Sequence, residues 1–160
     1  MDKTRRYIAL ATLVIIATSF KIDLLLDDDI QYPTGYRNWM HIKSGIVGPG
    51  HENILYRGFN HVYANDKALT GYQSGFFPHG SIIVFDVVEA VPKENYIAEG
   101  KRRHMDVMVR DTTKFASTRG WGYAQFESDN SPRMLTADQK TKCYTCHLKQ
   151  QDHVFTELRK

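Results

Sequence analysis

The 160-residue sequence is poor in cysteine and has no strong excess of charge of either sign. It contains 21 Lys and Arg residues against 18 Asp and Glu residues, a formal net charge of +3, and nothing in this balance suggests nucleic-acid binding. It also lacks a long hydrophobic run, because the apolar stretch over residues 7–20 is short for a transmembrane helix. The only two cysteines are Cys143 and Cys146, so any cysteine chemistry must use this closely spaced pair.

Residues 1–19 have the pattern of a secretory signal peptide. A basic start (MDKTRR) precedes the apolar run over residues 7–20, and Ala-Thr-Ser near its end offers a small-x-small cleavage site. Because apolar residues continue just beyond this run, an uncleaved anchor that tethers the chain to the inner membrane is the alternative. We therefore expect a periplasmic protein in which residues 20–35, with their acidic cluster, form an exposed N-terminal segment.

Cys143 and Cys146 belong to a single Cys-x-x-Cys-His sequence that ends at His147. This is the attachment signature of a c-type haem, in which each thiol adds across a haem vinyl group and the histidine ligates the iron. A redox dithiol would need a βαβ context, a zinc site would need four ligands, and a structural disulfide would need no histidine. The motif therefore predicts one covalent haem c, with His147 as the proximal ligand, and covalent attachment outside the cytoplasm agrees with the signal peptide.

Hydrophobic periodicity indicates a β-rich domain with short helices. The sequence predicts an α+β, mainly β fold: an antiparallel sheet of about five strands, short helices, and a C-terminal helix that carries the haem motif. Strands are expected within residues 53–64, 81–90, 103–110 and 122–128, and helices over 36–44, 66–73, 112–118 (with Asp111 as N-cap) and 136–150.

In this chain the haem motif follows a β-rich region and lies near the C-terminus. The usual small c-type cytochrome is instead all helical and has its haem motif near the N-terminus. Several short stretches occur in a distinctive order: YRNW at 36–39, HVY at 61–63, the strand at 81–88, VRD at 109–111, KFA at 114–116, GW at 120–121, the haem motif, and VFT at 154–156. In this order the chain resembles the cytochrome P-460 family, which includes the cytochromes c′-beta, and the likeness covers residues 34–157. We therefore treat residues 36–160 as one haem domain.

The resemblance implies a five-stranded antiparallel sheet packed against helices, usually in a homodimer, with the sheet covering the distal face of a five-coordinate haem. In members that oxidise hydroxylamine, a lysine on a sheet strand is cross-linked to the porphyrin and polar residues line the distal pocket. In the c′-beta members that lysine is absent and phenylalanine caps the iron. These members bind small gases, above all nitric oxide.

The residues at the corresponding positions of this chain resemble the c′-beta type. Matching the strand at 81–85 places Phe85 at the position of the cross-linking lysine, and no lysine lies between Lys67 and Lys93. Asn60 falls near the distal arginine of the oxidising members, and Asp106 falls near their distal glutamate.

An apolar ring over the iron gives a bound ligand no hydrogen bond, and dioxygen depends on such a bond more than nitric oxide or carbon monoxide does. Phe85, with Phe59 as a candidate second cap, therefore predicts a mono-haem cytochrome that binds nitric oxide for transport, buffering or detoxification. One alternative is an oxidoreductase acting on hydroxylamine or a nitrogen oxide, with Asp106 as its catalytic base. The other is an electron-transfer cytochrome that meets a redox partner cytochrome and has Met105, Met108 or a histidine as sixth ligand.

Overall fold

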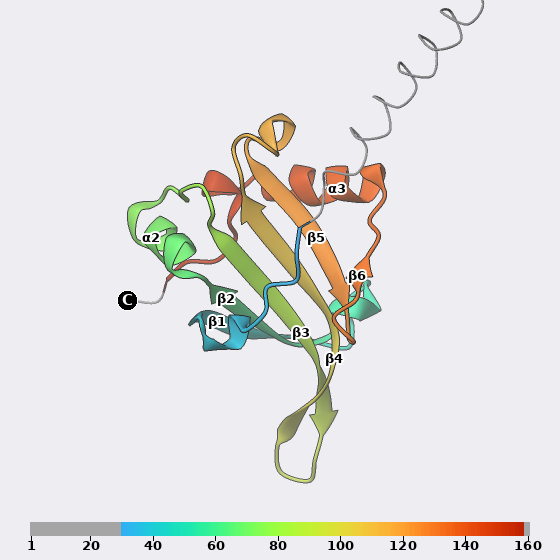
Figure 1. Ribbon diagram of the computed structural model, residues 1–160. Helices are drawn as coiled ribbons and strands as arrows, with labels where there is room; N and C mark the ends of the chain where they lie inside the picture. Colours follow the sequence, from blue (N-terminus) through green and yellow to red (C-terminus); the bar gives the residue numbers. More distant parts are fainter. Residues whose placement is uncertain (1–29, 159–160) are drawn as a thin grey trace, which may run out of the picture.

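The structure is a computed structural model that describes residues 30–158 (Figure 1). The signal peptide predicted over residues 1–19, the anchor alternative and the acidic cluster at 27–29 lie outside the described residues. Within residues 30–158, no helix is long and apolar enough to cross a membrane.

A six-stranded antiparallel sheet forms the centre of the molecule, and the order of its strands in space follows their order in the chain (Figure 1). The mainly β fold with short helices is confirmed, with one strand more than the five or so expected. The strands are Met40–Val47 (β1), Gly58–Ala64 (β2), Ile82–Pro92 (β3), Ile97–Arg110 (β4), Trp121–Glu127 (β5) and Pro132–Arg133 (β6). Strands β3 and β4 extend beyond the rest of the sheet as a twisted hairpin (Figure 1).

The helix predicted over residues 36–44 is wrong, because only Tyr36–Asn38 forms a 3₁₀ turn and the chain is extended from Met40. The spacing of aromatic residues fits a helix, but Ser44 and Gly45 are poor helix formers and the segment finds a partner strand. It pairs with β2 along its whole length, with a bulge just after His41. Pairing with β2 therefore outweighs the local pattern, and residues 40–47 form a strand that the sequence did not predict.

The helix predicted over residues 112–118 is also wrong, because this loop contains turns and one 3₁₀ turn, Ala116–Thr118. Asp111 still caps the loop, since its Oδ1 accepts hydrogen bonds from the backbone N–H groups of Thr113 (2.9 Å) and Lys114 (2.8 Å). The loop must return the chain from β4 to the adjacent β5, and β-branched threonines do not favour a helix over so short a distance.

The other two helices form where the sequence places them. Helix α2, Asp66–Ser74, begins at the N-cap Asn65 and ends at Gly75, which has a left-handed φ of 84°. Helix α3, Ala137–His147, begins with a complete capping box between Thr136 and Gln139. It ends three residues before the expected end at Gln150, and a separate 3₁₀ turn follows at Gln151–His153.

The two faces of the sheet have different coverings. The face covered by α2 and α3, called the helical face below, has a core that includes Val62, Ile83 and Trp121. On the opposite face, called the N-terminal face, the segment that begins at Ile30 packs over Val84 and other residues. Ile30 and Pro33 are buried there, so this end of the segment expected to be exposed is partly covered. Both faces of β3 are therefore covered, which explains its nearly continuous apolar sequence.

A buried carboxylate fastens the N-terminal segment to the sheet. Asp86 is fully buried on the N-terminal face, where its Oδ2 accepts hydrogen bonds from Tyr36 Oη (2.5 Å) and Arg37 Nη2 (2.7 Å). Its other oxygen accepts from Arg102 Nε at 3.0 Å. Burial and the bond to Asp86 raise the pKa of Tyr36 to about 12, so the phenol stays protonated and donates. This cluster fixes the start of the domain on the face away from the haem motif.

Candidate haem site

The haem motif lies on α3, and the geometry of a helix brings its three functional side chains together. Cys146 and His147 follow Cys143 by three and four residues, so all three lie on one side of the helix. The three side chains line one cavity of about 460 Å³ between α3 and the helical face of the sheet. Neither cysteine is in a disulfide.

The imidazole of His147 is oriented by the main chain. Its Nδ1 lies 2.7 Å from the carbonyl oxygen of His153, and because a carbonyl can only accept, Nδ1 must carry the proton. In the neutral ring, Nε2 is then the atom with a free lone pair, which is the arrangement that metal-bound histidines usually have. Burial lowers the pKa of His147, which favours this neutral form.

The carbonyl of His153 reaches His147 because two consecutive residues adopt left-handed backbone angles. Asp152 has a φ of 40° and His153 a φ of 65°, which few non-glycine residues adopt. Asp152 is held there by a hydrogen bond from the backbone N–H of Phe77 (2.8 Å) and by an ion pair with Arg110 (3.8 Å). The ring of His153 is buried and stacked on Tyr144, with centroids 5.5 Å apart.

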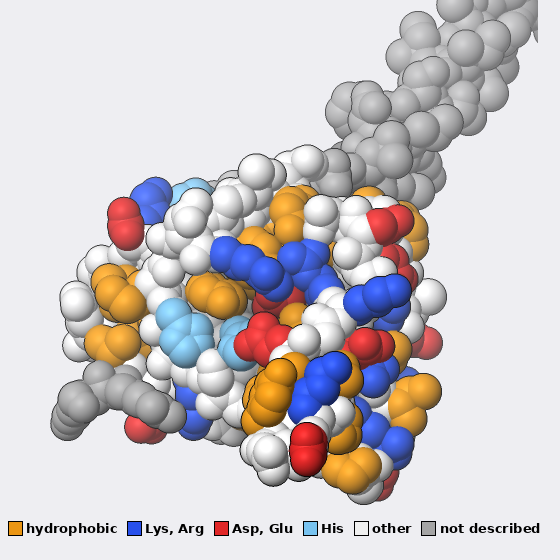
Figure 2. Space-filling model, turned by 90° about the horizontal axis from the view of Figure 1, so that it is seen from below, with side chains coloured by type: hydrophobic (Ala, Val, Ile, Leu, Met, Phe, Trp, Pro, Cys, Tyr) orange, Lys and Arg blue, Asp and Glu red, His pale blue; other side chains and the backbone are white. Residues whose placement is uncertain are grey.

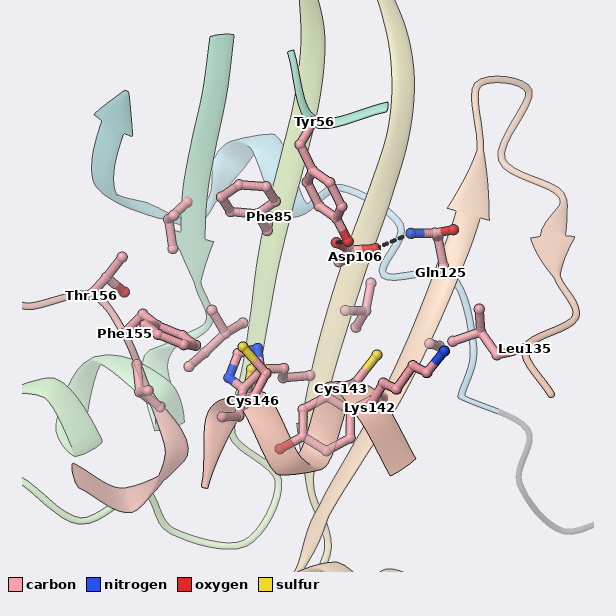
Figure 3. A pocket seen from close by; sticks show the side chains of 18 residues that line it. Tyr56, Phe85, Asp106, Gln125, Leu135, Lys142, Cys143, Cys146, Phe155 and Thr156 are labelled. Carbon is pink, nitrogen blue, oxygen red and sulfur yellow. Dashed lines mark hydrogen bonds between the residues drawn. The ribbon is translucent and has the colours of Figure 1, made fainter. Parts of the chain in front are cut away.

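The wall of the cavity opposite the two sulfur atoms combines aromatic and polar side chains (Figure 3). Phe85 lies on β3, and Tyr56, from the 3₁₀ turn before β2, lies beside it with ring centroids 6.3 Å apart. Asp106 on β4 accepts hydrogen bonds from Tyr56 Oη at 3.1 Å and from Gln125 Nε2 at 2.6 Å. Burial, and then the charge of Asp106, raise the pKa of Tyr56, so its hydroxyl keeps the proton that it donates.

Further polar groups lie next to Asp106 and Gln125. Arg133 on β6 donates to Gln125 Oε1 (2.6 Å) and pairs with Glu127, and this pairing lowers the pKa of Glu127. His104 is fully buried, and its Nε2 lies 3.6 Å from Asp106 Oδ2, with no hydrogen bond to either ring nitrogen. The carboxylate of Asp106 is thus surrounded by an amide, a phenol and an imidazole.

The structure brings together some of the residues that the sequence singled out and separates others. Phe85 and Asp106 line the cavity together with the motif. Asn60 is not among the lining residues, although alternation along β2 puts it on the same face as Val62. Phe59 lies on the opposite face, where its ring stacks on that of His61 (6.3 Å, 11°), so the structure does not bring it to the cavity as a second cap.

The two candidate methionine ligands also lie on different faces. Met108 lines the cavity, whereas Met105 is fully buried in the core of the N-terminal face. The sequence argument missed Tyr56, Gln125 and the His153 carbonyl. Tyr56 lies outside any strand, so no alternation marks it. A contact made by a backbone carbonyl does not depend on the side-chain pattern. Gln125 could have been found, because the alternation along β5 puts it on the face of the cavity.

The residues around the cavity fit a haem c. Two thiols and one neutral imidazole are the required donors, and most of the other lining residues are apolar, as the porphyrin requires. Burial raises the pKa of Cys143, so this thiol stays in its neutral form. The apolar lining consists of Val62, Ile83, Phe85, Val107, Met108, Ala124, Leu135, Val154 and Phe155, together with the rings of Tyr56 and Tyr123.

Comparison with models of known protein families matches residues 33–156 to the family Cytochrome P460. The chain belongs to this family. No curated protein matches the chain. The match spans the sheet and α3, and it includes the whole cavity described above. Membership of the Cytochrome P460 family gives the class of cofactor, a haem c, and the donors on α3 are where this chain would hold it.

Proposed function

We propose that the chain is a periplasmic, homodimeric mono-haem cytochrome of the c′-beta type that binds nitric oxide at an open position on the iron. Cys143 and Cys146 would carry the haem and His147 would be the proximal ligand, with Nε2 directed to the iron by the His153 carbonyl. The haem supplies the iron to which a small gas binds. The exported location rests on the signal pattern of residues 1–19, and the dimer rests on the resemblance alone.

The observation that carries this proposal is the composition of the cavity wall opposite the thiols. Phe85 stands where a cross-linking lysine would be needed and offers a ligand no hydrogen bond. On this wall the phenol of Tyr56 and the amide of Gln125 both donate to Asp106. A ligand that lies against this wall therefore meets rings and a carboxylate rather than a donor directed at it. This favours nitric oxide or carbon monoxide over dioxygen, which gains more from a donated hydrogen bond.

The test is the rate at which the reduced protein takes up carbon monoxide and nitric oxide, measured by stopped-flow absorbance. We expect Phe85→Ala to speed association about tenfold, which corresponds to a barrier lower by about 1.4 kcal/mol. Phe59→Ala is the matched control, because the same ring is removed from the other face of the sheet. Equal rates for the parent and Phe85→Ala would contradict the role given to Phe85.

Asp106 favours a second candidate, the oxidation of hydroxylamine. Its carboxylate lies in the cavity wall opposite the sulfur atoms, and its side chain is 29% exposed, so it is able to accept a proton from a substrate there. The assay is hydroxylamine oxidation by the loaded protein with an added electron acceptor. Turnover that disappears in Asp106→Asn would support the oxidase, and a parent protein with no turnover would support gas binding.

The optical spectrum of the reduced protein addresses the electron-transfer alternative. We expect a high-spin spectrum, because an open iron position has no strong sixth ligand. A low-spin spectrum that becomes high-spin in Met108→Leu would show that this methionine occupies the position and would contradict the proposal.

A further inference from the structure

Two histidine side chains lie close together on the N-terminal face, away from the cavity. Figure 2 shows histidine side chains next to an acidic side chain on the face seen from below. Nε2 of His41 lies 2.8 Å from the hydroxyl of Ser44, and the same hydroxyl lies 2.7 Å from Nδ1 of His61. Two imidazole nitrogens on neighbouring strands therefore converge on a single oxygen atom.

We propose that His41 and His61 form a second site, which binds a divalent transition-metal ion such as Zn²⁺ or Cu²⁺. Neutral imidazole is a preferred ligand of both ions. The hydroxyl of Ser44 or water completes the coordination, since the described residues contain no group of three or more His, Cys, Asp and Glu side chains placed around one ion. Zn–N bonds of about 2.0–2.1 Å are shorter than the present contacts to the Ser44 hydroxyl, so the two rings turn toward the ion when it binds between them.

Glu99 gives one of these imidazoles the partner that a metal-binding histidine usually has. Its Oε1 lies 2.9 Å from Nε2 of His61, the nitrogen that faces away from Ser44. That nitrogen is buried and its N–H is not aligned for a hydrogen bond. An ion on Nδ1 requires the proton to be on Nε2, beside the carboxylate, and the positive charge that the ion brings strengthens this contact. Glu99 is thus a positioning residue and not a ligand in this site.

Aromatic neighbours hold both rings in place before an ion arrives. The ring of His41 packs edge-on against Tyr63, with centroids 5.4 Å apart, and Phe59 stacks on His61. The side chain of His61 is only 14% exposed, whereas Ser44 and His41 are open to solvent. A site that is fixed on one side and open on the other admits an ion at a low cost in conformational entropy.

The experiment titrates the haem-loaded protein with Zn²⁺ in a calorimeter and with Cu²⁺ in an electron paramagnetic resonance spectrometer. The haem occupies the thiols and His147, so these groups do not compete for the added ion. We expect one saturable equivalent of Zn²⁺ and a Cu²⁺ signal split by two imidazole nitrogens. His41→Gln and His61→Gln should each abolish saturable binding, and Glu99→Gln should weaken it about 10–100-fold.

His79→Gln is the matched control, because His79 is 58% exposed and lies 3.8 Å from the carboxylate of Asp111 in another part of the molecule. It should bind Zn²⁺ like the parent protein. Binding that persists in both His41→Gln and His61→Gln, or a parent protein that binds no ion, would overturn the proposal. Circular dichroism and the haem spectrum check that each variant is folded, and neither outcome depends on which gas or substrate the haem binds.

Discussion

The left-handed turn that orients His147 should be held together by the side chain of Asp152. In Asp152→Ala, Phe77 N–H loses a charged acceptor, which costs about 1.5–3 kcal/mol. Alanine also pays about 1–2 kcal/mol to stay left-handed at a φ of 40°. The ion pair with Arg110 adds little, because its two charged groups are 3.8 Å apart, which is too long for a hydrogen bond. We expect Asp152→Ala to lower the free energy of unfolding by about 2–4 kcal/mol, because neighbouring contributions do not add fully.

Two further variants separate these contributions. Asp152→Gly removes the acceptor but adopts the left-handed conformation freely, so it should lose less stability than Asp152→Ala. Asp152→Asn keeps an acceptor oxygen and tolerates the conformation, so it should lose least. Urea unfolding of the haem-loaded variants measures all three. A loss in Asp152→Asn equal to that in Asp152→Ala would refute the role of the hydrogen bond, and equal losses in the glycine and alanine variants would refute the role of the backbone angle.

Three other predictions concern stability and are also measured by urea unfolding, the two substitutions on the haem-loaded protein and the pH dependence on the haem-free protein. Asp86→Ala should cost about 3–5 kcal/mol, because it leaves the mostly buried guanidinium of Arg102 without its carboxylate partner, and a loss below about 1 kcal/mol would show that water reaches the cluster. Burial lowers the pKa of both His147 and His153, so the unfolded chain binds protons more readily than the folded chain. The haem-free protein should therefore lose stability as the pH falls through about 6.5. A free energy of unfolding that does not change between about pH 7 and pH 5 would contradict this. Gly122→Ala should cost about 1–3 kcal/mol, because its Cβ would lie 2.3 Å from the ring of Phe115, unless the ring can turn aside.

The sequence pattern located the four central strands, and it missed β1 and β6, the two strands at the edges of the sheet. The apolar run that became β3 and the alternation in β4 are local signals, so both strands were found. Residues 40–47 have mixed character, and they form β1 because β2 offers them a row of unpaired backbone groups. Only the three-dimensional arrangement contains that information.

In the candidate site too, the local sequence predicts some of the features and the three-dimensional arrangement decides the others. The Cys-x-x-Cys-His motif places both cysteines and His147 on α3, and alternation along β4 puts Asp106 at the cavity and Met105 on the other face of the sheet. The same alternation puts Phe59 and Asn60 on opposite faces of β2, so the two could not both have faced the cavity. The His153 carbonyl depends on two unusual backbone angles, and nothing in the residue types at 152 and 153 requires them.

The place of α3 behind the last strand has a consequence for the order in which the protein is assembled. Every strand ends before the first haem-binding cysteine, and each pairs with a neighbour in sequence, so the loops that must close are short. As the polypeptide is made from its amino end, the sheet therefore has all its residues before the thiols appear. We therefore expect the sheet, with Phe85 and Asp106 on it, to form without help from α3, and the helix that carries the two cysteines to pack onto it last.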